Sequence, residues 1–294
     1  MNDVTKEHID EIEFQICGTV LISMTNHGEP RDISIPHIFP DGRTIHCIDP
    51  LFCNGEYLEI NIANEITNIM PRAFKEARCQ KVVWSSGCKT IPFCCFQKSI
   101  IKEIANIESV EAIEQRAFEN TRISHIDWPS KCIEIPGYCF LKSKLRTISN
   151  IQEVQYICTS AFELSQTREF AWPTKCKTIP ERCFWGSWLG LLSGTENVTS
   201  IGEAALSKCS LTEFKWPSGC FNVPDQCFLG SYKIKSVTNL KHVTHIGNSA
   251  FVNLLNLESL DLSEAPIQSI GKDAFAGTDK KSISLPYYIS DECI

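Results

Sequence analysis

Phenylalanine recurs along the chain at nearly equal intervals. Ten phenylalanines and one leucine follow one another at 22 residues, lengthening to 23 and 24 near the end. These markers are Phe52, Phe74, Phe96, Phe118, Phe140, Phe162, Phe184, Leu206, Phe228, Phe251 and Phe275. Tryptophan recurs at twice that interval, 44 residues, at Trp84, Trp128, Trp172 and Trp216. Such regularity predicts a repeat protein in which each coil buries its apolar side against its neighbours.

Each repeat begins with a short stretch in which apolar and polar residues alternate. In the segment 123–128, Ile126 and Trp128 are predicted to face the core while His125 and Asp127 face solvent, as in a β-strand. Pro129 cannot donate to a strand ladder and so ends the strand. The rest of the coil, up to its Ala-Phe or Cys-Phe pair, is predicted to return through a short helical turn.

The position occupied by tryptophan holds a small residue in the intervening coils. These residues are Asn106, Asn150, Gly194 and Asn239. A large side chain beside a small one in successive layers fills a close-packed core. The alternation therefore predicts that both residue types face the core.

A period of 20 to 29 residues with regularly placed aliphatic residues is typical of a leucine-rich-repeat solenoid. We predict an α/β protein of about 11 coils of 22 residues, with a parallel β-sheet on the concave face and short helical turns on the convex side. Residues 1–42 are predicted to form an amino-terminal cap, made of a polar leader and a β-hairpin. Its strands are expected at 14–24 and 33–36, with a turn at Asp41-Gly42. Residues 43–294 are predicted to form the solenoid, and its last coil is expected to be incomplete at Cys293-Ile294.

The repeat carries a family resemblance. The pattern Ile-x-x-x-Ala-Phe, preceded by Ile-Pro or Trp-Pro, occurs as Ile113-Glu-Gln-Arg-Ala117-Phe118, and a related Leu-Pro occurs at Leu285-Pro286. Over residues 43 to 294 this pattern resembles the BspA-type leucine-rich-repeat family. Its members are mostly cell-surface proteins of bacteria and protozoan parasites that bind proteins or matrix. The resemblance thus implies protein binding and no catalytic residues, although the 44-residue super-repeat and the cysteines depart from the family pattern.

Composition narrows the choice of partner. A formal net charge of −7 offers no basic stripe for a phosphate backbone, which argues against nucleic acid. No apolar run approaches the roughly 18 residues of a membrane span, and the polar start at Met1-Asn2-Asp3 is unlike a signal peptide. With so many cysteines, a cytoplasmic protein is expected; the alternative is a cell-surface protein.

The chain has 16 cysteines. Eight form four pairs seven residues apart: Cys88 and Cys95, Cys132 and Cys139, Cys176 and Cys183, Cys220 and Cys227. In the intervening coils Val and Ala fill these positions, which favours buried thiols that act as small apolar residues. Four intracoil disulfides are the alternative, in an oxidising compartment.

Neither catalysis nor cofactor binding is indicated. The recurrent cysteine spacing differs from Cys-x-x-Cys, so no metal site is expected. His125 and Asp127, with Glu103 and Glu169 of adjacent coils, form the one cluster that resembles a catalytic group, and on an open sheet it is expected to be solvated surface. We therefore expect no enzyme activity and no cofactor.

A protein partner is expected, on the concave face or on a patch at residues 185–191. The candidate residues are Trp185, Trp188 and Leu191 in the patch, and Glu103, His125, Asp127, Glu169, Glu213 and Lys215 on the face. Aromatic residues at exposed positions are typical interface anchors. In the alternative, Trp188 turns inward to fill the position that Gly194 leaves empty. A further end-to-end contact is possible at the carboxyl edge.

The predicted function is a non-catalytic protein-protein interaction module, foremost an intracellular scaffold or assembly component. The alternative is a cell-surface adhesin-like protein that binds host or matrix proteins.

Overall fold

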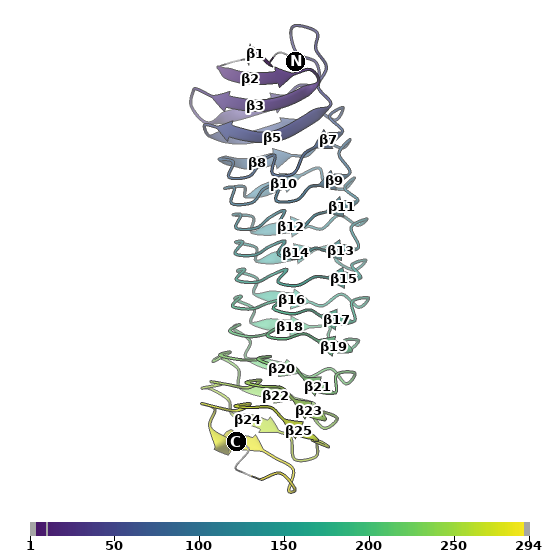
Figure 1. The fold of residues 1–294 in the computed structure, drawn as a ribbon, viewed down its shortest axis with the longest axis vertical. Helices are drawn as coiled ribbons and strands as arrows, with labels where there is room; N and C mark the ends of the chain where they lie inside the picture. Colours follow the sequence, from purple (N-terminus) through teal and green to yellow (C-terminus); the bar gives the residue numbers. More distant parts are fainter. Residues whose placement is uncertain (1–3, 10, 291–294) are drawn as a thin grey trace. The chain divides into compact units, whose positions relative to one another are not determined.

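The computed structural model describes residues 4–9 and 11–290, so Met1-Asn2-Asp3 and Cys293-Ile294 lie outside the described residues. The chain is a β-solenoid of about 11 coils with parallel sheets (Figure 1). It divides into two compact units, Met1–Ile151 and Gln152–Ile294, which we call unit 1 and unit 2.

Two strands per coil form two sheet faces in each unit. The front strands of unit 1 are β4 (Arg31–Ile35), β6 (Tyr57–Ile62), β8 (Cys79–Val83), β10 (Glu103–Ala105), β12 (His125–Asp127) and β14 (Thr147–Ser149). The back strands are β5 (Cys47–Asn54), β7 (Asn68–Ile69), β9 (Thr90–Ile91), β11 (Ala112–Ile113) and β13 (Glu134–Ile135). The front strands are those assigned from sequence to the concave face.

Unit 2 repeats this plan. Its front strands are β16 (Glu169–Ala171), β18 (Leu191–Ser193), β20 (Glu213–Lys215), β22 (Ser236–Thr238), β24 (Ser259–Asp261) and β26 (Ile283–Ser284). Its back strands are β15 (Tyr156–Ile157), β17 (Thr178–Ile179), β19 (Ser200–Ile201), β21 (Asn222–Val223), β23 (His245–Ile246) and β25 (Ser269–Ile270). Near the end, the Tyr288 hydroxyl donates to the Ala265 carbonyl at 3.0 Å, whereas Tyr287 is 99 % exposed.

At the amino-terminal end, three strands form an antiparallel meander. β1 (Val4–Ile9) pairs with β2 (Ile12–Cys17), which pairs with β3 (Val20–Asn26). The single strand expected over 14–24 is wrong, because Gly18 has a φ of +61° and lets the chain reverse there. β3 then pairs in parallel with β5, so the meander and the first back strands form one continuous sheet.

The recurrent phenylalanines form the core. The nine markers from Phe74 to Phe251 are each 0 % exposed, and Phe275 is 2 % exposed. Neighbouring rings stack almost in parallel, as between Phe96 and Phe118 in unit 1, whose centroids lie 5.7 Å apart at 4°. In unit 2, Phe251 and Phe275 do the same at 5.6 Å and 3°. Such aromatic pairs contribute about 0.5–1.5 kcal/mol beyond their burial.

No α-helix occurs in the described part of the chain, where the only helix is the 3-10 helix η1 (Lys280–Ser282). The helical turns expected on the convex side are replaced by turns around each phenylalanine. Residues two before and two after it have positive φ, as at Arg116 (60°) and Asn120 (54°) around Phe118. A left-handed residue breaks a right-handed helix. Arg116 and Phe118 donate instead to carbonyls of the next coil, Gly137 and Cys139.

Tryptophan closes the turn that follows each front strand of its coil. Trp128 is buried, and its indole N–H donates to the Cys132 carbonyl at 3.0 Å. The same bond joins Trp84 to Cys88 (3.2 Å), Trp172 to Cys176 (3.1 Å) and Trp216 to Cys220 (2.7 Å). The inward position of tryptophan is therefore confirmed, and its partner is the cysteine four residues later.

The small residues that alternate with tryptophan do not fill the core. Asn106 and Asn239 are half-buried and Asn150 is exposed, so the packing interpretation is wrong. Their shared property is backbone conformation, since φ is +62° at Asn106, +60° at Asn150, +73° at Gly194 and +65° at Asn239. Asparagine and glycine adopt this region most readily. The Asn106 amide also donates to the Trp84 carbonyl at 2.6 Å.

Each tryptophan coil pairs its front strand with that of the following coil, and pairing also continues from β6 to β8 and from β22 through β24 to β26. β8 pairs with β10, β12 with β14, β16 with β18 and β20 with β22, always from a tryptophan coil to the following coil. β10 and β12 belong to different sheets, as do β18 and β20. The left-handed residue Asn106 follows the last residue of β10, and the left-handed Gly194 follows the last residue of β18, so each stands at one of these two interruptions of the front sheet. We call these places the β10–β12 step and the β18–β20 step.

The recurrent cysteines are buried, as small apolar residues would be. Those free in the structure are Cys88, Cys95, Cys132, Cys176, Cys183, Cys220 and Cys227. The thiols of Cys88 and Cys176 lie 3.1 and 3.4 Å from the carbonyl oxygens of Ile66 and Val154, 22 residues earlier. Burial raises the pKa of Cys132 and Cys176 to about 12 and that of Cys88 and Cys220 to about 11.

We expect these seven thiols to be unreactive toward a thiol reagent at pH 8 in the folded protein. Their raised pKa values leave little thiolate at that pH, and burial excludes the reagent. Kinetics of labelling with and without denaturant, read by mass spectrometry, would check this. Fast labelling of Cys132 or Cys176 in the native protein would contradict the burial of these two thiols.

The left-handed position predicts how Asn106 responds to substitution. Asn106→Ala forces an alanine into positive φ and removes the amide bond to Trp84, so we expect a loss of about 1–2 kcal/mol. Asn106→Gly loses the bond but keeps the conformation, and should cost less. Urea denaturation of both variants would decide, because a core-packing role would instead make Gly the more damaging substitution.

Candidate partner-binding surface

Trp188 occupies the coil position four residues after its core phenylalanine. In unit 1 this position holds Arg78, Ile100, Arg122 and Lys144, and in unit 2 Gln166, Trp188, Ser210, Tyr232, Leu255 and Asp279. The exposed fractions of Trp188, Tyr232 and Leu255 are 49, 51 and 72 %. We call Trp188, Ser210, Tyr232 and Leu255, which follow one another in successive coils, the edge row. It is a run of large apolar side chains with one small residue between them.

Trp188 borders a surface hollow beside the front strands of unit 2. We call it the Gly190 hollow; it is lined by Arg168, Glu169, Trp188, Gly190, Leu191, Ser210, Thr212 and Lys233. Gly190 stands where other coils have long side chains such as Arg146 or Arg168, and Ser210 stands where the neighbouring coils have Trp188 and Tyr232. These two small residues leave the hollow open between larger neighbours.

Leu191 is 47 % exposed and borders the same hollow. It begins strand β18 in register with Glu169 of β16, and Glu213 begins the following front strand, β20. The Leu191 side chain thus projects to solvent from a strand whose paired neighbour carries a carboxylate. The inward rotation of Trp188 considered from sequence is wrong, because Trp188 is half exposed and Gly194 serves a left-handed turn.

Trp185 lies on the turn side of the coil and does not line the Gly190 hollow. The guanidinium of Arg182 and the ammonium of Lys208 lie 4.6 and 4.7 Å from its ring centroid. Arg182 also pairs with Glu163 at 2.8 Å. Trp185 is therefore half-buried between two cations, so the structure separates it from the hollow that Trp188 and Leu191 share.

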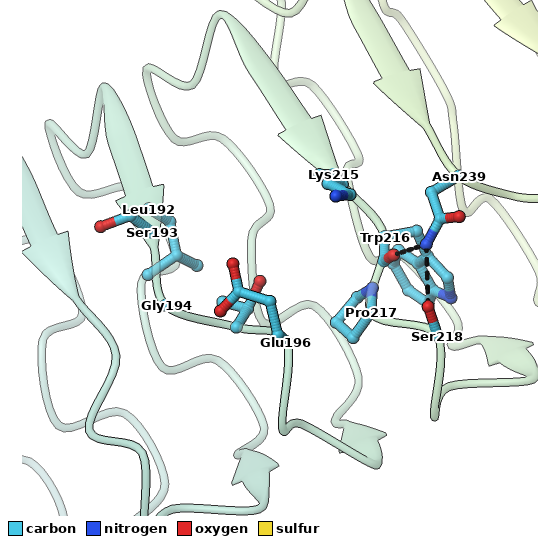
Figure 2. Close-up of a pocket in the computed structure, with 10 residues that line it drawn as sticks. Leu192, Ser193, Gly194, Glu196, Lys215, Trp216, Pro217, Ser218 and Asn239 are labelled. Atoms are coloured by element: carbon cyan, nitrogen blue, oxygen red, sulfur yellow. Dashed lines mark hydrogen bonds between the residues drawn. The ribbon is translucent and has the colours of Figure 1, made fainter.

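A second hollow lies beside the carboxyl ends of β18 and β20, whereas the Gly190 hollow lies beside their amino ends. Figure 2 shows this Gly194 hollow, with the Glu196 carboxylate in the space between Gly194 and Pro217 and with Lys215 above it. On its far side, the Asn239 amide donates to the Trp216 carbonyl at 2.7 Å and to Ser218 at 3.2 Å (Figure 2). The candidate Lys215 belongs here rather than to the Gly190 hollow.

The equivalent β10–β12 step in unit 1 holds Glu103, His125 and Asp127 around one hollow. His125 lies 2.8 Å from the Thr147 hydroxyl and 3.3 Å from Asp127, and the Ser149 hydroxyl donates to the same carboxylate. Ser149 and then His125 hold the pKa of Asp127 below its ordinary value.

Thr147, His125 and Asp127 are connected in the order of a catalytic triad, but His125 and Asp127 are 52 and 68 % exposed. A triad needs a buried carboxylate and an oxyanion site. The prediction that Glu169 adjoins His125 is wrong, because the residue in register with His125 on the paired strand β14 is Thr147. Among the described residues, no group of three His, Cys, Asp or Glu side chains could hold a metal ion. No helix of that part of the chain is long and apolar enough to cross a membrane.

Sequence reasoning missed Tyr232 and Leu255. Their signal was available, since both stand four residues after a core phenylalanine, like Trp188. The charged residues Arg122 and Lys144 at the same position indicate from sequence that it faces solvent, and the exposed fractions of Tyr232 and Leu255 agree.

Solved structures with the same fold include a leucine-rich repeat protein from Bacteroides ovatus, 18 % identical, with a TM-score of 0.60 and 92 % of each chain covered. The pneumococcal vaccine antigen PcpA is 15 % identical, with a TM-score of 0.54, over 94 % of this chain and 80 % of that one. No curated protein matches the chain. The model of the BspA type leucine rich repeat region matches residues 67–190 and 191–293 in 6 copies. This chain therefore belongs to the BspA-type leucine-rich-repeat family.

Proposed function

We propose that this chain is a non-catalytic protein-protein interaction module whose main contact surface is the Gly190 hollow and the edge row of unit 2. The observation that carries the proposal is the exposure of Trp188 and Leu191, at 49 and 47 %, around one hollow. Leucine-rich-repeat proteins generally bind other proteins through the surfaces of their stacked coils.

Large apolar side chains at a hollow are what an interface needs. Tryptophan is among the residues whose removal most weakens protein complexes, and such residues bind in pockets from which water is excluded. The polar groups of Glu169, Thr212 and Lys233 around the hollow supply a rim that remains hydrated before binding. The front-face candidates Glu103, His125, Asp127, Glu213 and Lys215 are proposed as secondary contacts.

As to its biological setting, we propose an intracellular scaffold or assembly component. Seven buried, free thiols support this setting, because an oxidising compartment favours disulfides. The alternative is a cell-surface adhesin-like protein that binds host or matrix proteins. It is supported by the fold shared with the pneumococcal vaccine antigen PcpA.

Loss of the two anchors tests the contact surface. We expect the double variant Trp188→Ser, Leu191→Ser to lose the proteins that the wild-type chain captures from its native cells, with each change costing under about 0.5 kcal/mol of stability. Quantitative mass spectrometry of the captured proteins and thermal unfolding would measure both. Tyr156→Ser is the matched control, since Tyr156 is 58 % exposed on back strand β15. An unchanged set of captured proteins in the double variant would refute the proposed surface.

The number of free thiols tests whether the chain resides in a reducing compartment. Chain isolated from its native cells and denatured without reductant should show 16 reactive thiols if it resides in a reducing compartment. Thiol counting by mass spectrometry after alkylation would measure this. A count near eight would instead indicate four disulfides and an exported protein.

A further inference from the structure

Positive charge lies beside the Gly190 hollow, although the chain as a whole has a net charge of −7. Arg168 and Lys233 line the hollow on either side of its small residues, and both side chains are exposed. Neither forms an ion pair with any residue that the structure describes, whereas nearby Lys235 is paired with Glu258 at 2.9 Å. The hollow therefore has two unpaired cations in its lining.

One of these cations is held near an aromatic ring. The Lys233 ammonium lies 6.0 Å from the ring centroid of Tyr232. A cation over an aromatic face is attracted to the ring and stays close to the apolar surface. A carboxylate that arrives there with an apolar side chain gains a charge-assisted hydrogen bond in partly dehydrated surroundings.

The Gly190 hollow has room for an added side chain. A Cβ built on Gly190 would lie 3.6 Å from its nearest recorded neighbour, the Arg168 carbonyl, and the backbone there is not left-handed. Its space is bounded by Trp188 and Leu191 on one coil and by Ser210 and Thr212 on the next. Its lining is thus apolar on one side and small and polar on the other, which suits one apolar side chain of a partner.

We propose that the partner segment bound at this surface is an acidic peptide with apolar side chains. One apolar side chain enters the Gly190 hollow, others contact Tyr232 and Leu255, and its carboxylates meet Arg168 and Lys233. The inference rests on the proposed function and names the chemistry of the partner. Glu169 is the one carboxylate that lines the hollow, against the two cations Arg168 and Lys233. Charge complementarity therefore favours an acidic segment over a basic one.

Three synthetic peptides of about ten residues, long enough to span the row at ~3.3 Å per residue, provide the probes. The first intersperses Glu and Asp with Leu and Phe, the second replaces each acid with Lys, and the third replaces each Leu and Phe with Ser. Fluorescence anisotropy with the full chain should show binding of the first and at least tenfold weaker binding of the others, a factor of ~10 per 1.4 kcal/mol. Affinity for the first should fall as salt rises.

Variants of the chain separate the two contributions. Arg168→Glu with Lys233→Glu should weaken the acidic peptide about tenfold or more and reduce its salt dependence. Gly190→Gln fills the hollow without changing charge, and should weaken the same peptide while leaving the salt dependence intact. Lys177→Glu, beside back strand β17, is the matched charge control and should have little effect. Circular dichroism would verify that each variant is folded.

Three results would overturn the inference: equal or tighter binding of the basic peptide, no binding of the acidic one, or no response to the two charge reversals. Sedimentation in which dimers form in the wild type but not in Trp188→Ser would also overturn it, by showing that a second copy covers the row. If capture of cellular proteins depends on Trp188 and Leu191 but the acidic peptide does not bind, the acidic segment is refuted and the proposed function stands. If Trp188→Ser changes neither the capture of cellular proteins nor the binding of the peptide, the proposed function and the acidic segment are both refuted.

Discussion

Backbone hydrogen bonding between successive coils is the constraint on which the structure depends. A coil of this length contains only short strands, so most of its buried N–H and C=O groups must find partners in the coil before or after it. On the front face they do so through the paired strands, and on the turn side through residues such as Phe118, whose N–H donates to Cys139. Because every coil serves as template for the next, its length and its turns are fixed almost to the residue.

That constraint explains why left-handed residues recur at fixed places. The N–H of Arg116 is directed to the next coil only because its φ is positive, and the same holds two residues beyond Phe118 at Asn120. The side chains of Arg116 and Asn120 are otherwise free to vary, since they are at least partly exposed, whereas Ala117 and Phe118 between them are buried. Sequence variation can therefore concentrate at exposed positions, such as that of Trp188, without disturbing the stack.

The coil period, the inward phenylalanines and tryptophans, and the outward His125 and Asp127 could be read from sequence because burial imposes a strict period. The turns could not, since an Arg or Lys at positive φ, as at Arg116, carries no local signature of that conformation. Asn106 and Gly194 did carry one, and a packing argument overlooked it. For the candidate surface, Trp188 and Leu191 stood out as exceptions to the repeat, whereas the Gly190 hollow depends on small neighbours in two coils, visible only once their positions are known.

At the β10–β12 and β18–β20 steps the front sheet is interrupted after an asparagine or glycine coil, so a tryptophan coil and its successor form a structural unit larger than the 22-residue coil. Adding or deleting 44 residues keeps every tryptophan coil paired with its asparagine or glycine coil, whereas a change of 22 residues would place two like coils side by side. Growth of such a protein by internal duplication is thus expected in double coils. Each duplication brings with it one more step, and so one more place where a hollow can acquire a new lining.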